Sequence, residues 1–326
     1  METKVETLVE NNSRNKINWK GLLSNYGTIL VLLLMVVAMS FISPNFLKTG
    51  NLVNIVRQIT MYAIIGFGVT FIIITGGIDL SSGSLVALSS MILGSLVIKF
   101  GWPWPLAILA CMAAGAVVGS INGFFVAYTK IPAFVATLGM MLSLKGVTLF
   151  VSDKPLHGFS DDFLFIGKGS WLGLPVLIYI LIIVGLLSHY LLKHTKFGRY
   201  VYSIGGNADA ARVSGINLEK TLVIAYAYAS TLAALTGVLL SSRVMTAQPT
   251  SGTGYEMDAI AGVVIGGTSL AGGVGTIWGT IVGALIIGVL NNALDLMLVN
   301  AYMQQVLKGV VIVAAVVLDT LRHRHQ

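Results

Sequence analysis

Charged side chains are scarce in this sequence of 326 residues. Lys, Arg, Asp and Glu make up 10% of it, against roughly 25% in an ordinary soluble domain, and 56% of the residues are hydrophobic. So few charges cannot cover the surface of a soluble protein, and long apolar runs indicate a polytopic membrane protein. Because these runs are continuous rather than alternating, they exclude a transmembrane β-barrel and predict an all-α fold.

Motifs for catalysis and for binding ATP or metal ions are missing as well. No Walker pattern G-x-x-x-x-G-K-[ST] occurs, and H-E-x-x-H, C-x-x-C and G-x-S-x-G are absent. The single cysteine, Cys111, excludes an intramolecular disulfide. These absences disfavour a membrane enzyme, and we expect no catalytic residue, no metal site and no cofactor bound by this chain.

About ten transmembrane helices are expected in one domain from residue 21 to residue 326. A polar segment, residues 1–20, precedes this domain. The expected spans are 27–43, 52–74, 81–98, 106–128, 133–151, 172–192, 222–242, 257–268, 276–294 and 301–318.

The net charge of +7 comes mostly from basic residues in short loops. Such residues set membrane topology, so we expect this role and no nucleic-acid partner. With a cytoplasmic N-terminus, ten spans return the C-terminus to the same side, and twelve basic residues then lie inside against four in the outer loops, or against eight when the four in the outer halves of spans are counted as outer. The inner ones are Lys4, Arg14, Lys16, Lys20, Lys130, Lys193, Lys196, Arg199, Arg212, Lys220, Arg322 and Arg324.

In this orientation residues 152–170 form the largest outer loop. The loop contains Asp153, Asp161 and Asp162. These acids either meet basic residues of an external partner or belong to an ordinary solvated loop, and the sequence leaves both possibilities open.

Two glycine-rich segments resemble each other and indicate broken helices. "TGGIDLSSGSLVAL" starts at Thr75 and "IGGTSLAGGVGTIW" at Ile265, so that Gly76 and Gly77 align with Gly266 and Gly267 as a possible internal repeat. The apolar run 257–268 would reach only about 18 Å as a helix, too short for a hydrocarbon layer of roughly 30 Å. In transporters such breaks mark the translocation path. Close helix packing through small residues is the alternative.

Four polar residues within apolar segments add to the candidate path or gate. Asp79 stands in the first break, where an ionisable residue is a functional candidate. The context "DLSSGS" also suits a helix N-cap, and we favour the cap for Asp79. Asn122, Asn291 and Asn292 either offer amides to hydroxyl groups or bond one helix to another.

A charged segment, residues 193–220, interrupts the apolar chain. Within it "NADAARVSG" predicts a short helix, with Asn207 as N-cap and Gly215 as a left-handed C-cap. Asp209 and Arg212 suit the helix dipole, and the small residues in the helix would let a partner approach closely. A plain solvated loop is the alternative. The predicted contact residues are Asn207, Ala208, Asp209, Ala210, Ala211, Arg212, Val213, Ser214 and Gly215.

Five quoted stretches resemble the permeases of sugar-type ABC importers, and the ribose importer permeases and their near relatives most of all. They are "IITGGIDLSSGSL", "GRYVYSIGGNADAARVSGI", "TAQPTSGTGYEMDAIAGVVIGGTSLAGGVGTIWGT", "SPNFLKTGNLVNIVRQ" and "PAFVATLGMMLSLKGVTL". They follow the family order over nearly the whole chain. The stretch "GGVGT" lacks the basic residue common in ribose-type members, so a related aldose such as allose stays open.

The resemblance implies a multi-pass permease in the bacterial cytoplasmic (inner) membrane that translocates a monosaccharide. It also implies a second permease copy, surrounding lipid, and a separate ATPase subunit that holds ATP and Mg and docks on Asn207–Gly215. An extracytoplasmic binding protein would deliver the sugar. An ion-coupled secondary transporter or channel is the alternative, disfavoured because the acids near spans lie close to span ends. Those acids are Asp79, Glu256, Asp258, Asp295 and Asp319.

Overall fold

The structure, a computed structural model, describes residues 19–323, so most of the expected polar segment 1–20 lies outside the described residues. The chain folds into helices joined by short connections, with one two-stranded hairpin. The helices are α1 (Trp19–Ile42), α2 (Thr49–Ile74), α3 (Ser82–Gly94) with a π-helical turn (Ser95–Lys99), α4 (Trp104–Tyr128), α5 (Ala133–Val151), α6 (Asp161–Lys168), α7 (Val176–His194), α8 (Lys196–Gly206), α9 (Ala208–Val213), α10 (Leu218–Val244), α11 (Tyr255–Ile265), α12 (Ile277–Leu296) and α13 (Ala301–His323).

The expected all-α membrane architecture is confirmed. Among the described residues, seven helices are long and apolar enough to cross a membrane: α2, α3 with its π-helical turn, α4, α5, α7, α10 and α12. The remaining three expected spans coincide with α1, α11 and α13, whose apolar parts are shorter. The span expected at 172–192 begins only at Val176, because β1 (Ser170–Trp171) and β2 (Leu174–Pro175) pair as an antiparallel hairpin before it.

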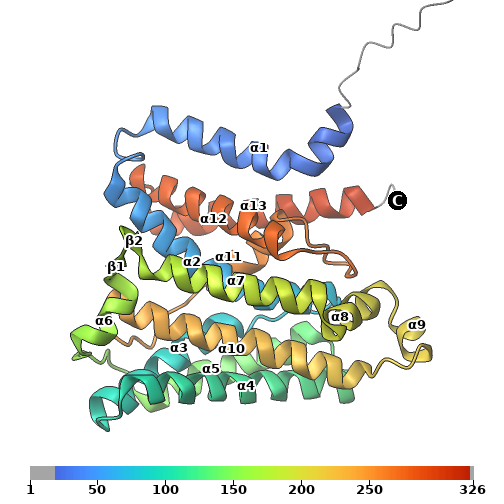
Figure 1. The fold of residues 1–326 in the computed structure, drawn as a ribbon, viewed down its shortest axis with the longest axis horizontal. Coiled ribbons are helices and arrows are strands. Elements are labelled where there is room, and N and C mark those ends of the chain that lie inside the picture. Colours follow the sequence, from blue (N-terminus) through green and yellow to red (C-terminus); the bar gives the residue numbers. More distant parts are fainter. Residues whose placement is uncertain (1–18, 324–326) are drawn as a thin grey trace, which may run out of the picture.

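The long helices lie side by side, with α1 at one edge of the molecule and α4 at the other (Figure 1). The central helices are α2, which is buried from Ile59 to Ile74, and α10, which packs against α4, α3 and α2. The hairpin and α6 lie together at one end, which we call the α6 end. Helices α8 and α9 lie at the opposite end, which we call the α8 end (Figure 1).

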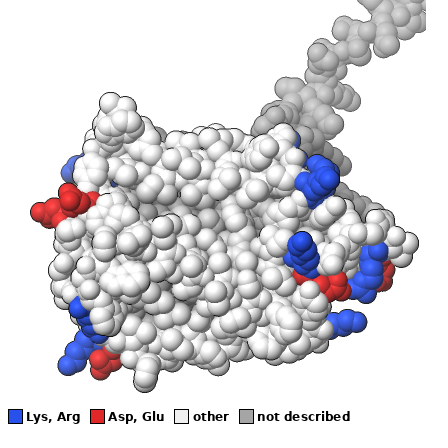
Figure 2. All heavy atoms as spheres, turned by 60° about the horizontal axis from the view of Figure 1, so that its bottom comes forward, with Lys and Arg blue, Asp and Glu red and all other residues white. Residues whose placement is uncertain are grey.

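On the face shown in Figure 2, charged side chains lie near the two ends of the molecule. Figure 2 shows Lys, Arg, Asp and Glu gathered at opposite edges, with a broad uncharged surface between them. Exposed apolar side chains of the long helices include Leu109, Val117 and Ile183. A face of this kind suits hydrocarbon, because lipid tails need no polar partner.

Few ionic contacts cross between the long helices. Asp258 of α11 is buried and pairs with Lys308 of α13, whose Nζ lies 3.0 Å from Oδ2. Near the α6 end, Asn51 of α2 and Asn292 of α12 exchange two amide hydrogen bonds of 3.0 and 2.8 Å. Helix α13 packs chiefly against α11, where it makes this ion pair, and Gln304 of α13 also donates to Asp295 of α12 at 3.0 Å.

Replacing Lys308 by Met should lower the unfolding temperature of the detergent-solubilised protein markedly. Removing one partner of a buried ion pair costs about 3–5 kcal/mol, because the carboxylate of Asp258 loses its cation. The double variant Lys308→Met with Asp258→Asn removes both charges and should regain most of the stability in the same thermal scan. An equally large loss in the double variant would contradict this account.

Candidate functional site

The first expected break is present between α2 and α3. The helix ends at Ile74, residues 75–81 are not helical, and Gly76 turns the chain with φ +82°. The freed backbone finds partners on α5, where the hydroxyl of Thr137 accepts the N–H of Leu80 at 3.2 Å and lies 3.1 Å from the carbonyl oxygen of Ile78. Such pairing is what allows a non-helical stretch at membrane depth.

Asp79 shapes this break but is not the N-cap of α3. Its Oδ1 accepts the backbone N–H of Ser81 at 2.8 Å and the Ser81 hydroxyl at 2.6 Å. Ser81 itself occupies the cap position and makes no side-chain cap bond. The favoured cap assignment is therefore wrong by two residues: Asp79 closes a local turn ahead of the helix.

Several buried polar atoms around the first break have no hydrogen-bond partner among the described residues. They include Asp79 Oδ2, Asn122 Oδ1 and the Tyr226 hydroxyl. Asn122 reaches the break from α4, with its amide donating to Ser81 Oγ at 3.0 Å, and Tyr226 of α10 lies against Gly77. Buried polar groups are normally paired, so this spot suits bound water or a partner that arrives when the helices move.

The second break, between α11 and α12, has a different construction. A Cβ added to Gly266 would overlap the carbonyl of Gly279, so Gly266 serves close packing of α11 on α12. Gly267 has open space and φ +92°, which makes it the turn residue. The aligned pairs therefore differ in conformation, because the turn falls on the first glycine of one pair and the second of the other. Thr276 then caps α12 by accepting the N–H of Gly279 at 3.0 Å.

Asn291 and Asn292 lie away from both breaks and bond helix to helix. The amide of Asn291 donates to the Tyr62 hydroxyl at 3.2 Å and lies 3.4 Å from Asp258 Oδ2, while Asn292 pairs with Asn51. Asn291 stands fourteen residues after the start of α12 at Ile277, about 21 Å along the helix. The structure thus brings Asn122, but not Asn291 or Asn292, to a break.

The charged segment 193–220 contains two helices where one was predicted. The predicted short helix is present as α9: the side chain of Asn207 accepts the N–H of Ala210 at 2.9 Å, and Gly215 follows the helix with φ +82°. Helix α8 was missed, although Thr195 caps it and buried Val201 and Ile204 follow a helical spacing. That cap and spacing were the available signal.

One residue of α9 that was expected to contact a partner, Ala211, faces the protein interior instead. Ala211 is only 4% exposed and packs with Ile204 of α8 and Leu218 of α10, so it is not available to a partner. Val213 is 90% exposed, so its side chain is free to contact a partner. Arg212 makes a 3.1 Å ion pair with Glu219. The outward face of α9 is therefore formed by Ala208, Asp209, Ala210, Arg212, Val213 and Ser214.

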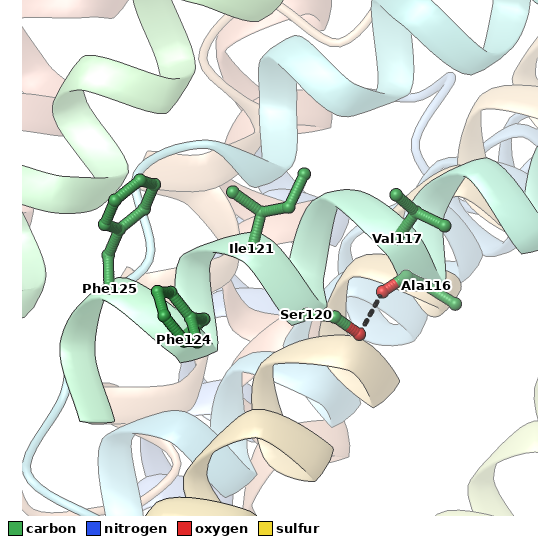
Figure 3. Close-up of a pocket in the computed structure, with 6 residues that line it drawn as sticks. All are labelled: Ala116, Val117, Ser120, Ile121, Phe124 and Phe125. Atoms are coloured by element: carbon green, nitrogen blue, oxygen red, sulfur yellow. Dashed lines mark hydrogen bonds between the residues drawn. The ribbon is translucent and has the colours of Figure 1, made fainter. Parts of the chain in front are cut away.

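A shallow hollow of about 370 Å³ lies on the outer face of α4 (Figure 3). Its lining comes from this one helix and is mainly apolar, with exposed Val117 and Phe124. The one polar side chain in the lining, Ser120, donates to the carbonyl oxygen of Ala116 at 2.7 Å. This hollow suits an acyl chain and not a sugar, which needs several free hydrogen-bonding groups.

Comparison with known proteins finds relatives that match nearly the whole chain. The family described as branched-chain amino acid transport system / permease component matches residues 51–316. The ribose import permease protein of Escherichia coli (strain K12) is 45% identical over 305 residues, which cover 92% of this chain and 95% of that protein.

Two further relatives extend the comparison. The ribose import permease protein of Bacillus subtilis (strain 168) is 43% identical over 309 residues, covering 94% of this chain and 96% of that protein. The D-allose transport system permease protein of Escherichia coli (strain K12) is 36% identical over 314 residues, 96% of each chain. No solved structure matches this chain.

Substitutions at Asp79 should separate a turn residue from a charged gate. Asp79→Asn keeps the acceptor oxygen for Ser81 and still places a polar atom at the position of Oδ2, so we expect near-normal thermal stability and normal transport. Asp79→Ala leaves the N–H and hydroxyl of Ser81 without their acceptor and should cost about 1–3 kcal/mol. A stable Asp79→Asn variant that no longer transports would instead assign the negative charge to the transport step.

Proposed function

Because this chain belongs to the family of branched-chain amino acid transport system permease components, we propose that it is the membrane-spanning permease subunit of an ATP-binding cassette importer for a monosaccharide. The observation that carries the proposal is the identity of 45% with a ribose import permease along almost the full length of both chains. The lower identity of 36% with a D-allose permease favours ribose, with a related aldose such as allose as the second candidate.

The chain is proposed to act with an ATPase subunit that binds ATP and Mg, without an ATP site of its own. The outward face of α9 is the proposed docking surface. Three features support it: α9 lies at the α8 end outside the long helices, it is fixed by the Asn207 cap, and it presents the exposed side chain of Val213. A partner that binds one conformation more tightly than the other can switch the helices between two arrangements.

We propose that the α8 end faces the cytoplasm of a bacterial inner membrane, with both termini on that side. Six basic residues lie at the α8 end, five of them within residues 193–220, which is the densest group of basic residues in the described chain, as the positive-inside rule favours. They are Lys130, Lys193, Lys196, Arg199, Arg212 and Lys220. The residues 1–20 would then form a cytoplasmic segment ahead of the permease domain 21–326.

The α6 end is the proposed docking side for an extracytoplasmic sugar-binding protein. Asp161 and Asp162 begin α6 and are exposed, and Asp153 is exposed in the preceding loop. Three carboxylates on one outer loop offer an acidic surface to basic side chains of that partner.

A second copy of this chain is proposed to complete the path through the membrane. Helix α5 is little buried, and its exposed residues include Gly139, Ser143, Lys145 and Gly146. An exposed lysine inside a span is costly against lipid, so this face fits water or protein better than hydrocarbon. The small residues beside it would let another helix approach. Lipid would cover the remaining apolar faces.

The first break is the proposed gate. Its unpaired polar atoms at Asp79, Asn122 and Tyr226 support this assignment, since they offer partners to groups that arrive only in another conformation. Gly76 and Gly267 would allow the breaks to bend, and Gly77 and Gly266 would set how closely the neighbouring helices approach.

Reconstitution in liposomes tests the proposed function. We expect the complex of this chain with its ATPase and binding protein to take up labelled ribose only with ATP on the ATPase side, unaffected by a protonophore. Competing sugars, allose among them, would identify the substrate. Uptake by this chain alone, driven by an ion gradient, would support the ion-coupled transporter instead.

Val213→Asp should weaken association with the ATPase subunit by about tenfold or more. Burying a valine side chain contributes about 1.5–3 kcal/mol, and the new carboxylate would have to be desolvated as well. Binding is measured by titrating the ATPase onto the solubilised permease. Leu172→Asp is the matched control, because Leu172 is also exposed, at 79%, but lies at the α6 end. Equal weakening by both substitutions would contradict docking at α9.

A further inference from the structure

The last turn of α8 contacts both helix breaks through backbone atoms. A Cβ added to Gly205 would overlap the carbonyl oxygen of Ile74 at the end of α2, and would lie 2.5 Å from the nitrogen of Gly273 in the second break. The N–H of Gly273 donates to the same Ile74 oxygen at 2.8 Å. Three segments that are distant in the sequence therefore meet at one carbonyl group. A side chain on Gly205 would separate them.

Side chains reinforce this three-way contact. The hydroxyl of Tyr202 on α8 donates to the carbonyl oxygen of Gly275 in the second break at 2.6 Å. Burial raises the pKa of Tyr202, so the hydroxyl keeps its proton and remains a donor. Phe197 of α8 stacks on Phe71 in the last turn of α2, with ring centroids 5.6 Å apart. Helix α8 is thus held at once to the C-terminal end of α2 and to the second break.

The same helix is coupled tightly to α9. Asn207 is the one residue between the end of α8 at Gly206 and the start of α9 at Ala208. Ile204, Ala211 and Leu218 form a small buried cluster that joins α8, α9 and the start of α10. A displacement of α9 is therefore passed to α8, because close-packed elements move together rather than deforming.

We infer that Gly205 and Tyr202 are positioning residues that transmit a displacement of α9 to both helix breaks together. The inference rests on the proposed function, since the ATPase subunit is the agent that would displace α9. The first break leads into α3 and the second into α12. One contact can therefore shift the N-terminal ends of both helices. The two breaks would then change in concert and not one after the other.

Neighbouring glycines provide a matched pair of variants. Gly205→Ala introduces a methyl group into the three-way contact, whereas Gly206 has no atom within 4 Å of an added Cβ. In the reconstituted complex, Gly205→Ala should lower the sugar moved per ATP hydrolysed by about tenfold or more, because small misplacements of this kind have large effects on rate. Gly206→Ala should stay within about twofold of the unmodified protein, as surface substitutions usually do.

Tyr202→Phe keeps the ring and removes only the hydrogen bond to Gly275, so it decides the question if Gly205→Ala fails to fold. We expect ATPase binding to be unchanged and the melting temperature to fall by a few degrees at most, because one hydrogen bond makes only a small net contribution to stability, while the sugar moved per ATP should fall about three- to tenfold. An unchanged ratio in Tyr202→Phe would overturn the inference. So would a loss of uptake that is fully explained by a smaller amount of folded complex.

The unmodified complex separates this inference from the proposed function. If it shows no ATP-dependent uptake, the proposed function fails. If it does, and Tyr202→Phe or a folded Gly205→Ala variant remains fully coupled, only the transmission through α8 is overturned.

Discussion

A backbone group that leaves a helix inside a bilayer must find its partner within the protein, because lipid provides none. Both breaks meet this requirement by using neighbouring segments. Gly273 bonds to the carbonyl of Ile74, and the Thr137 hydroxyl accepts the N–H of Leu80. The C-terminal end of α2, the last turn of α8 and the second break therefore cannot be positioned independently. The burial of α2 at the centre of the molecule provides the fixed surface for these contacts.

The membrane-spanning elements could be predicted because their signal is local. Each long apolar run has only one well-paired conformation in lipid, so hydropathy identified the seven long helices and the short α11. Elements outside the hydrocarbon were harder to predict. Helix α8 has only a few buried apolar residues, and α6 and the hairpin at Ser170–Pro175 depend on packing against neighbouring segments.

For the candidate site, the sequence indicated which residues stand at the breaks but not their partners. The contact between Ile74 and Gly273 joins distant positions, and no local pattern encodes it. Ala211 was expected to face outward, yet helix α8, which was not predicted, covers it. The assignment of Asp79 failed because a cap and a preceding turn look alike in sequence and differ only in where α3 begins.

The ion pair of Asp258 and Lys308 also imposes an order on the assembly of the chain. A lysine near the centre of a membrane helix costs about 2.5–3.5 kcal/mol on insertion, unless a partner awaits it. Synthesis proceeds from the N-terminus, so α11 and its carboxylate precede α13. In the folded chain the Asn291 amide also lies 3.4 Å from Asp258 Oδ2, so α12, which is made before α13, offers an uncharged partner. The carboxylate of Asp258 therefore meets its cation only after the last described helix has been made.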